Sequence, residues 1–378
     1  MAGIYIHIPY CKKKCVYCDF YFKINTDDMH EMINCIIKEL VRRKKYVKTS
    51  RINTIYFGGG TPSILTEKEI KKILSTIYDN YKVCEKPEIT LEANPDDLNM
   101  KKIANFFNVG VNRLSIGVQS FNDDDLIFLN RNHSREDAIS SIKTAQKIGF
   151  KNISADLMYG LPNQSLNDWE DNLNLLFDLN IQHLSAYMLT LEKKTKLFEY
   201  VKKNKVKMTD DTTVINQYYS LLNIAKKNNF VQYEISNFAK DNVFSKHNTS
   251  YWQNKLFLGI GPSAHSFNYE SRRWNIASNK KYIEKLNTNN IYFEEEILTI
   301  NQQYNEYVLT NLRTMWGINI NVIKSRFGSK FASHTIKMMQ KWNEKKYINE
   351  SNENVVLTDK GSVFADKIIS DLFFVENL

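Results

Sequence analysis

Long apolar runs are missing from this sequence. No stretch of roughly 18 or more apolar residues occurs, so we expect no transmembrane helix. The first residues alternate like a strand and lack both the basic segment and the long apolar core of a signal peptide. Cysteine is also scarce: the chain has five, and Cys11, Cys15 and Cys18 are too close together to form a disulfide framework. We therefore expect a cytoplasmic protein with reduced thiols.

Internal repeats and low-complexity linkers are absent too. With 43% hydrophobic and 12% aromatic residues, the composition excludes a disordered chain. Its 378 residues predict two or three domains. The net charge of +9 favours an anionic ligand or surface without requiring one.

The first two-thirds of the chain alternates short β-branched runs with amphipathic segments. The predicted strands are Ile4–Ile8, Ile52–Phe57, Glu88–Glu92, Arg113–Val118, Ile153–Met158 and His183–Met188. Six strands alternating with helices predict a parallel βα array, either an open doubly wound sheet or a partly closed barrel. We favour an α/β fold with a partial (β/α)6 TIM-like barrel, because polar residues follow the carboxyl end of each strand, where barrel sites are built.

The character of the sequence changes at Asn301. We predict helices over Tyr304–Met315, Val322–Phe327 and His334–Glu344, then a Tyr347–Leu357 hairpin and an Asp359–Phe373 helix. This order is typical of a small α+β winged-helix-like domain. The predicted domains are a barrel over residues 1–240, a covering segment over 241–300 and the C-terminal domain over 301–378.

Three cysteines with the spacing C-x3-C-x2-C predict a metal site. Cys11, Cys15 and Cys18 follow directly after the first predicted strand. Three thiolates on one loop can hold three irons of a [4Fe-4S] cluster and leave the fourth iron open. A zinc site would require a fourth cysteine or histidine nearby, and none follows.

Further motifs lie at the ends of successive predicted strands. They are Tyr56–Ser63 (YFGGGTPS), Leu91–Pro95 (LEANP), Ser115–Phe121 (SIGVQSF), Leu129–Arg131 (LNR) and Asp156–Pro162 (DLMYGLP). The three glycines of the first motif allow a ligand to approach the backbone closely. Each motif alone has a structural explanation, but their order along the chain is specific.

Together with the cysteine spacing, these motifs resemble the radical S-adenosylmethionine (SAM) superfamily. Within it they resemble the HemN family of oxygen-independent coproporphyrinogen III oxidases, and most closely its HemW branch of heme chaperones. The resemblance implies a [4Fe-4S] cluster, SAM and heme as cofactors. It implies that SAM is contacted by Tyr5, Phe20, Gly59, Gly60, Thr61, Glu92, Gln119, Arg131 and Asp156.

Three departures separate the sequence from the oxidases. Phe20 stands where the oxidase pattern has a fourth cysteine, and we expect the oxidases' long segment before the first strand to be lacking. Lys246–Trp252 matches the HNxxYW motif associated with the HemW branch, with His247 as the implied heme ligand. A structural histidine capping a turn is the alternative, and His265 is a second candidate ligand.

The expected function is therefore that of a heme chaperone, which delivers heme to an apo-hemoprotein such as a respiratory cytochrome. The alternative is an oxygen-independent coproporphyrinogen III oxidase, and we assign no catalytic residue. A homodimer and transient contact with a membrane surface belong to the same expectation. A winged-helix-like domain on a basic chain would also permit nucleic-acid binding, which we do not favour because lysine faces are usually just solvated.

Overall fold

A 12-stranded sheet runs through the computed structural model, which describes residues 2–48 and 50–375. Its centre is formed by six parallel strands in sequence order. These are β1 (Ala2–Ile8), β2 (Ile52–Gly59), β3 (Val83–Ala93), β4 (Arg113–Gln119), β5 (Ile153–Tyr159) and β6 (His183–Met188). The six predicted strands are thus confirmed, and the last coincides with β6 residue for residue.

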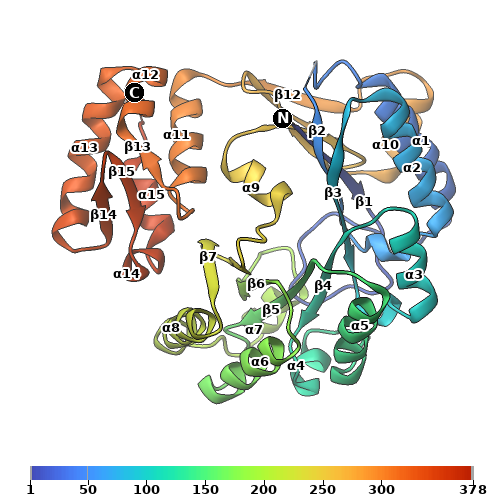
Figure 1. Cartoon of the computed structure of the whole chain (residues 1–378), viewed down its shortest axis with the longest axis horizontal. Helices are drawn as coiled ribbons and strands as arrows, with labels where there is room; N and C mark the ends of the chain where they lie inside the picture. Colours follow the sequence, from blue (N-terminus) through green and yellow to red (C-terminus); the bar gives the residue numbers. More distant parts are fainter. Residues whose placement is uncertain (1, 49, 376–378) are drawn as a thin grey trace.

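Helices cover the convex side of this sheet (Figure 1). In the barrel they are α1 (Met29–Arg42), α2 (Glu67–Asn80), α3 (Met100–Asn108), α4 (Asp123–Phe128), α5 (Arg135–Ile148), α6 (Leu166–Asp178), α7 (Lys196–Lys202) and α8 (Asp211–Lys227), with short 3-10 turns at Pro62–Ile64 and Pro95–Asp97. Each long helix buries one apolar stripe against the strands. Helix α2 begins at a capping box, in which Thr66 accepts from the backbone of Glu69 and Glu69 accepts from that of Thr66. The large indole of Trp169 on α6 is fully buried.

The sheet remains open and is extended at both edges. Strand β9 (Leu256–Ile260) pairs parallel to β1, and β10 (His265–Phe267), β11 (Ser271–Asn275) and β12 (Phe293–Ile297) follow antiparallel. At the other edge lie β8 (Asn237–Lys240) and β7 (Phe230–Glu234). An order that starts at β12 and ends at β7 leaves the barrel partial, as predicted.

Residues 241–300, expected to cover the barrel, mostly lengthen its sheet. Four strands of this segment belong to the same sheet, and α10 (Asn279–Asn287) packs beside α1. Helix α9 (Lys246–Trp252) differs, because it lies on the concave side of the sheet and contacts β1, β2 and β9 (Figure 1). Within residues 241–300, α9 is thus the element that covers the concave side of the sheet.

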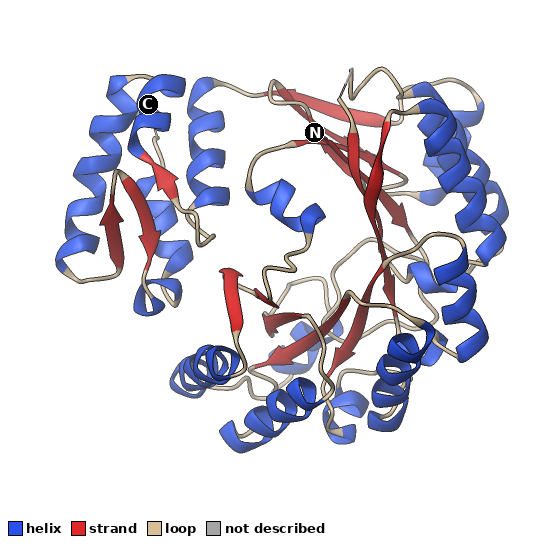
Figure 2. Ribbon diagram, in the orientation of Figure 1, coloured by secondary structure: helices blue, strands red, loops and turns tan. Residues whose placement is uncertain are grey.

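The C-terminal residues form a second body with its own core (Figure 2). Helices α11 (Ile300–Asn311), α12 (Ile320–Phe327), α13 (Ser329–Glu344), α14 (Asp359–Ser362) and α15 (Ala365–Leu372) surround a small sheet of β13 (Ile318–Asn319), β14 (Ile348–Ser351) and β15 (Asn354–Leu357). This is the expected arrangement of helices and a hairpin. The last predicted helix is divided, because the chain turns between α14 and α15.

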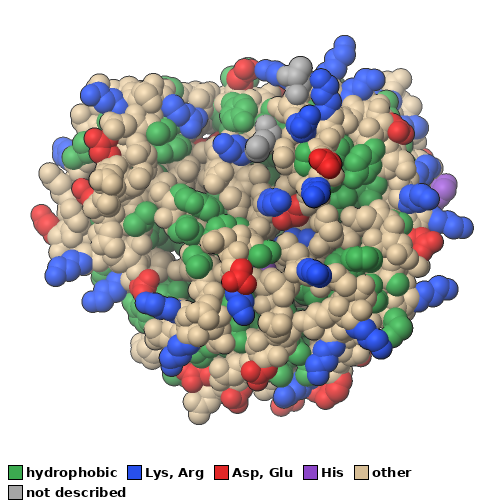
Figure 3. All heavy atoms as spheres, in the orientation of Figure 1, with side chains coloured by type: hydrophobic (Ala, Val, Ile, Leu, Met, Phe, Trp, Pro, Cys, Tyr) green, Lys and Arg blue, Asp and Glu red, His purple; other side chains and the backbone are tan. Residues whose placement is uncertain are grey.

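The face of the molecule in Figure 3 is of mixed charge. On the face in Figure 3, basic and acidic side chains are interspersed. No helix in the described ranges has the length and apolarity needed to cross a bilayer.

Candidate functional site

A cavity of about 1020 Å³ lies at the carboxyl ends of the six parallel strands. The last residues of β2 to β6 contribute to its walls, as in other barrels of parallel strands. The cavity brings together eleven of the residues expected to bind the cluster or SAM: Cys11, Cys15, Cys18, Phe20, Gly59, Gly60, Thr61, Glu92, Gln119, Arg131 and Asp156. Residues scattered over more than half of the barrel sequence therefore share one site.

The cysteine loop is fixed by backbone hydrogen bonds at both ends. The N–H of Cys11 donates to the carbonyl of Lys23 at 2.9 Å, and that of Val16 donates to the carbonyl of Leu129 at 3.2 Å. The Asn130 amide also donates to the carbonyl of Lys14, at 2.7 Å. These hydrogen bonds hold the loop against the chain at Lys23 and at Leu129–Asn130.

The surroundings of the cysteines suit an anionic cluster. Thr61 Oγ1 donates to Cys11 Sγ at 3.3 Å, and Arg131 Nη1 donates to Cys15 Sγ at 3.4 Å. Within the described residues Arg131 forms no ion pair with a carboxylate, and its buried Nε has no partner. A buried guanidinium without a counter-ion is costly, and thiolates or a ligand carboxylate would neutralise it.

Burial makes the thiolates of the cysteine loop harder to form in the absence of a cation. It raises the pKa of Cys11 to about 12 and that of Cys18 to about 11. The thiolates therefore need a bound cation to form at neutral pH. In the part of the chain that is described, no three His, Cys, Asp or Glu side chains meet closely enough for a single metal ion. In a [4Fe-4S] cluster each thiolate binds a different iron, so the three sulfur atoms need not meet around one metal ion.

The glycine motif brings the second strand close to the first. Gly59 has a φ of +106°, and a Cβ there would lie 2.4 Å from His7 Nδ1. Only glycine fits both the conformation and the space. The free backbone N–H of Gly59 then donates to Glu92 Oε2 at 3.1 Å, which fixes that carboxylate at the cavity wall.

Two carboxylates of the cavity titrate near neutral pH. Burial raises the pKa of Glu92 to about 7 and that of Asp156 to about 6. Hydrogen bonds act in the opposite direction, from Tyr56 to Glu92 at 2.8 Å and from Ser115 to Asp156 at 3.3 Å. The buried guanidinium of Arg113 also lowers both pKa values. Both groups can thus bind cationic or hydroxyl-bearing ligands.

Two expected site residues lie outside the cavity lining. Tyr5 stacks with Tyr56, with ring centroids 6.0 Å apart. His247 is 1% exposed, and its ring nitrogens Nδ1 and Nε2 each lie 2.7 Å from a hydroxyl, of Thr54 and Tyr251 respectively. Ligation of heme iron by His247 would require one of these two hydrogen bonds to break.

The remaining candidates lie at the surface. Phe20 is 70% exposed at the rim of the cavity. His265 is exposed on β10, where its ring stacks with that of Trp274 at 6.1 Å. Of the two cysteines outside the cluster motif, Cys35 is buried and Cys84 is half-buried.

Sequence reasoning missed several residues of the cavity. Asn94 accepts from Arg131 at 2.7 Å and belongs to the LEANP motif, so its place after a strand was an available signal. Met188, Arg313 and Phe364 also line the cavity. Nothing in the local sequence marks the last two, because the C-terminal domain brings them to the barrel.

Some known proteins are similar in sequence to this chain over nearly its whole length. A model of the radical SAM superfamily matches residues 5–176. The heme chaperone HemW of Bacillus subtilis is 34% identical over 372 residues, covering 97% of this chain and 98% of that protein. HemW of Lactococcus lactis is 29% identical and covers 98% of both chains. The mitochondrial radical S-adenosyl methionine domain-containing protein 1 of Danio rerio is 38% identical over 265 residues, which are 70% of this chain and 60% of that protein.

A solved structure has the same fold. Coproporphyrinogen III oxidase HemN of Escherichia coli superimposes with a TM-score of 0.85 and covers 98% of this chain and 90% of that one. The two sequences are 20% identical, so the likeness concerns the fold. It includes the barrel, the added strands and the C-terminal domain.

Proposed function

This chain belongs to the HemW family of the radical SAM superfamily, and from that premise we propose that it is a heme chaperone. In this proposal it binds heme and transfers it to an apo-hemoprotein, with a [4Fe-4S] cluster and SAM bound in the barrel. The observation that carries the proposal is that one cavity holds both the cluster and SAM candidates, here called the polar half, and exposed apolar side chains of β6 and the C-terminal domain, here called the apolar half.

The polar half suits the cluster and SAM. Cys11, Cys15 and Cys18 are the proposed cluster ligands, and a cluster held there would supply a low-potential electron. Arg131 is the available cation for the SAM carboxylate, because its guanidinium has no carboxylate partner among residues 2–48 and 50–375. Asp156 is placed for ribose hydroxyls or an ammonium group.

The apolar half suits a large flat ligand. Large hydrophobic side chains are normally buried, yet Tyr187, Met188 and Phe364 are 43%, 46% and 42% exposed, and all three line the cavity. Tyr187 and Met188 end β6, whereas Phe364 lies between α14 and α15. A macrocycle between these two walls would bury apolar surface of both domains.

Charges at the same wall suit the propionates of heme. Arg313 and Lys367 line the cavity beside Phe364. Arg313 pairs with Asp366 of α15, and Lys367, whose side chain is 68% exposed, pairs with Asp371 at 3.0 Å. We therefore propose that heme lies against this wall. Met188 is the candidate iron ligand there, because a methionine thioether is a known ligand of heme iron.

A heme titration of the cluster-reconstituted protein, followed at the Soret band, tests this function. We expect saturable binding by the wild type and at least tenfold weaker binding by Phe364→Asp. Ile336→Asp is the matched control, because Ile336 is 50% exposed in the same domain but does not line the cavity. No Soret shift in the wild type would refute the chaperone function. Equal binding by both variants would place heme elsewhere.

The recipient and the reaction are tested with the same protein. Incubation of the heme-loaded chain with an apo-cytochrome should restore the recipient's absorbance spectrum. Anaerobic incubation with coproporphyrinogen III, SAM and reductant should give no protoporphyrinogen, and its formation would support the oxidase alternative. A cytoplasmic location, a respiratory recipient, a homodimer and contact with a membrane surface belong to the proposal.

A further inference from the structure

Within the HNxxYW segment, residues 247–252, His247 is buried and the other residues are half-buried. The backbone N–H groups of Lys246 and His247 both donate to the carboxylate of Glu88, each at 3.0 Å. Both ring nitrogens of His247 are bonded to hydroxyls, at 2.7 Å each. Burial lowers the pKa of His247 to about 3, with a further contribution from Arg113, so the imidazole is neutral. The ring is therefore fixed in position from both edges.

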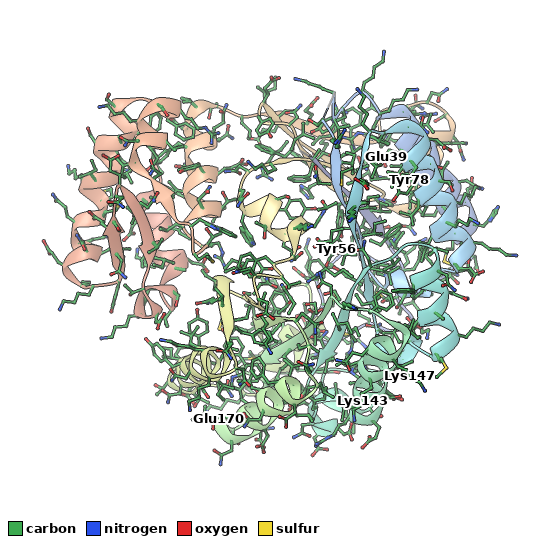
Figure 4. The ribbon with its side chains drawn as sticks, in the orientation of Figure 1. Glu39, Tyr56, Tyr78, Lys143, Lys147 and Glu170 are labelled. Carbon is green, nitrogen blue, oxygen red and sulfur yellow. The ribbon has the colours of Figure 1, made fainter. Side chains whose placement is uncertain are left out.

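The fixed imidazole packs against a residue of the neighbouring strand. Its ring lies 4.9 Å from that of Tyr56, centroid to centroid, at an angle of 26°. Tyr5 lies nearly parallel to both, 6.4 Å from His247 and 6.0 Å from Tyr56. Figure 4 shows Tyr56 between α9 and the strands. The three rings form a triangular cluster that limits where the Tyr56 hydroxyl can point.

That hydroxyl contacts Glu92, which lines the cavity. Tyr56 Oη donates to Glu92 Oε1 at 2.8 Å, while Gly59 donates to the other oxygen of Glu92. Space for this contact depends on Gly58, where a Cβ would lie 2.9 Å from the Tyr56 ring and 3.0 Å from Glu92 Oε1. The path from α9 to the cavity thus consists of one ring contact and one hydrogen bond.

We propose that His247 is a positioning residue for the SAM half of the cavity, which acts through Tyr56 to hold Glu92, and that it is not a heme ligand. The inference rests on the proposed SAM site and is independent of the proposed heme site. In this proposal α9 supports SAM binding, and a substitution of His247 lowers the affinity for SAM.

SAM binding to the cluster-reconstituted full chain, measured by calorimetry, tests the inference. We expect His247→Ala and Tyr56→Phe each to weaken SAM binding at least fivefold. The double variant should bind no more weakly than the worse single variant, because both changes interrupt one path. Tyr251→Phe removes only the hydroxyl at His247 Nε2, so it provides a milder test if His247→Ala does not fold.

The matched control is Tyr282→Phe. Tyr282 also donates its hydroxyl to a buried carboxylate, that of Glu39 at 2.5 Å, but neither residue lines the cavity. We expect its SAM affinity to stay within twofold of the wild type. A second readout is the heme titration, in which His247→Ala should retain the wild-type Soret band.

The outcomes separate the two proposals. Loss of the Soret band in His247→Ala with unchanged SAM affinity would make His247 an iron ligand and overturn the inference. Additive losses in the double variant would overturn the path through Tyr56. A wild type that binds heme but not SAM would refute the SAM site itself and leave the heme proposal standing.

Discussion

The carboxylate of Glu92 makes the stability of the ligand-free protein depend on pH. Burial raises its pKa from 4.5 to about 7, so the folded chain favours the protonated form. The unfolded chain loses this proton at lower pH. Stability therefore falls as pH rises from about 4.5 to 7, and the loss is complete above the folded pKa.

Glu92→Gln removes this titration and keeps the hydrogen bonds. The amide oxygen can accept from Gly59, and the amide nitrogen can donate to the Tyr56 hydroxyl. At about 1.4 kcal/mol per pKa unit, the variant should gain roughly 2–3 kcal/mol over the wild type between pH 5 and 8. Below pH 5 the two proteins should differ little through this group.

Urea unfolding of the apoprotein at pH 5, 6, 7 and 8, followed by circular dichroism, measures the effect. Glu344→Gln provides the control, because Glu344 is exposed at the end of α13. Its stability should run parallel to that of the wild type at all four pH values. A constant difference between wild type and Glu92→Gln over this range would refute the reasoning, since it would mean that Glu92 does not titrate there.

Three further changes test the site and the barrel. Cys15→Ala should abolish the broad iron–sulfur absorption near ~400 nm after reconstitution while leaving the far-ultraviolet circular dichroism intact; a normal chromophore would contradict its role as a ligand. Gly59→Ala should weaken SAM binding at least tenfold in calorimetry, because its φ of +106° and the nearby His7 ring exclude a side chain. Trp169→Ala should lower the free energy of unfolding by about 3–5 kcal/mol, since a buried indole and its bond to the Gln217 carbonyl are lost; a urea midpoint like that of the wild type would refute this.

The parts of the fold that depend on local pattern were predictable. Strand β6 coincides with its predicted bounds, because the alternation of side chains along a strand involves neighbouring residues. The cysteine spacing is local in the same sense. Strand-end motifs lie together because parallel strands bring their carboxyl ends to one side.

Features made by distant contacts were not predictable. The burial of His247 depends on α9 lying inside the curve of the sheet, and no residue pattern within α9 specifies that. Phe364 and Arg313 reach the cavity only through the docking of the C-terminal domain. The role of Arg113 was not predicted from the sequence either. Its side chain is 1% exposed, and its charge lowers the pKa values of Glu92 and Asp156.

The pairing of β1 with β9 has a consequence for biosynthesis. Strand β1 carries the cysteine loop at its end, yet one of its two neighbours begins only at Leu256. At roughly 5–20 residues per second, translation leaves that edge of β1 unpaired for on the order of 10–50 seconds. During this interval the thiols are already outside the ribosome, while β9 has still to be made. The edge of the sheet beside the cysteine loop is therefore completed only after Leu256–Ile260 has been synthesised.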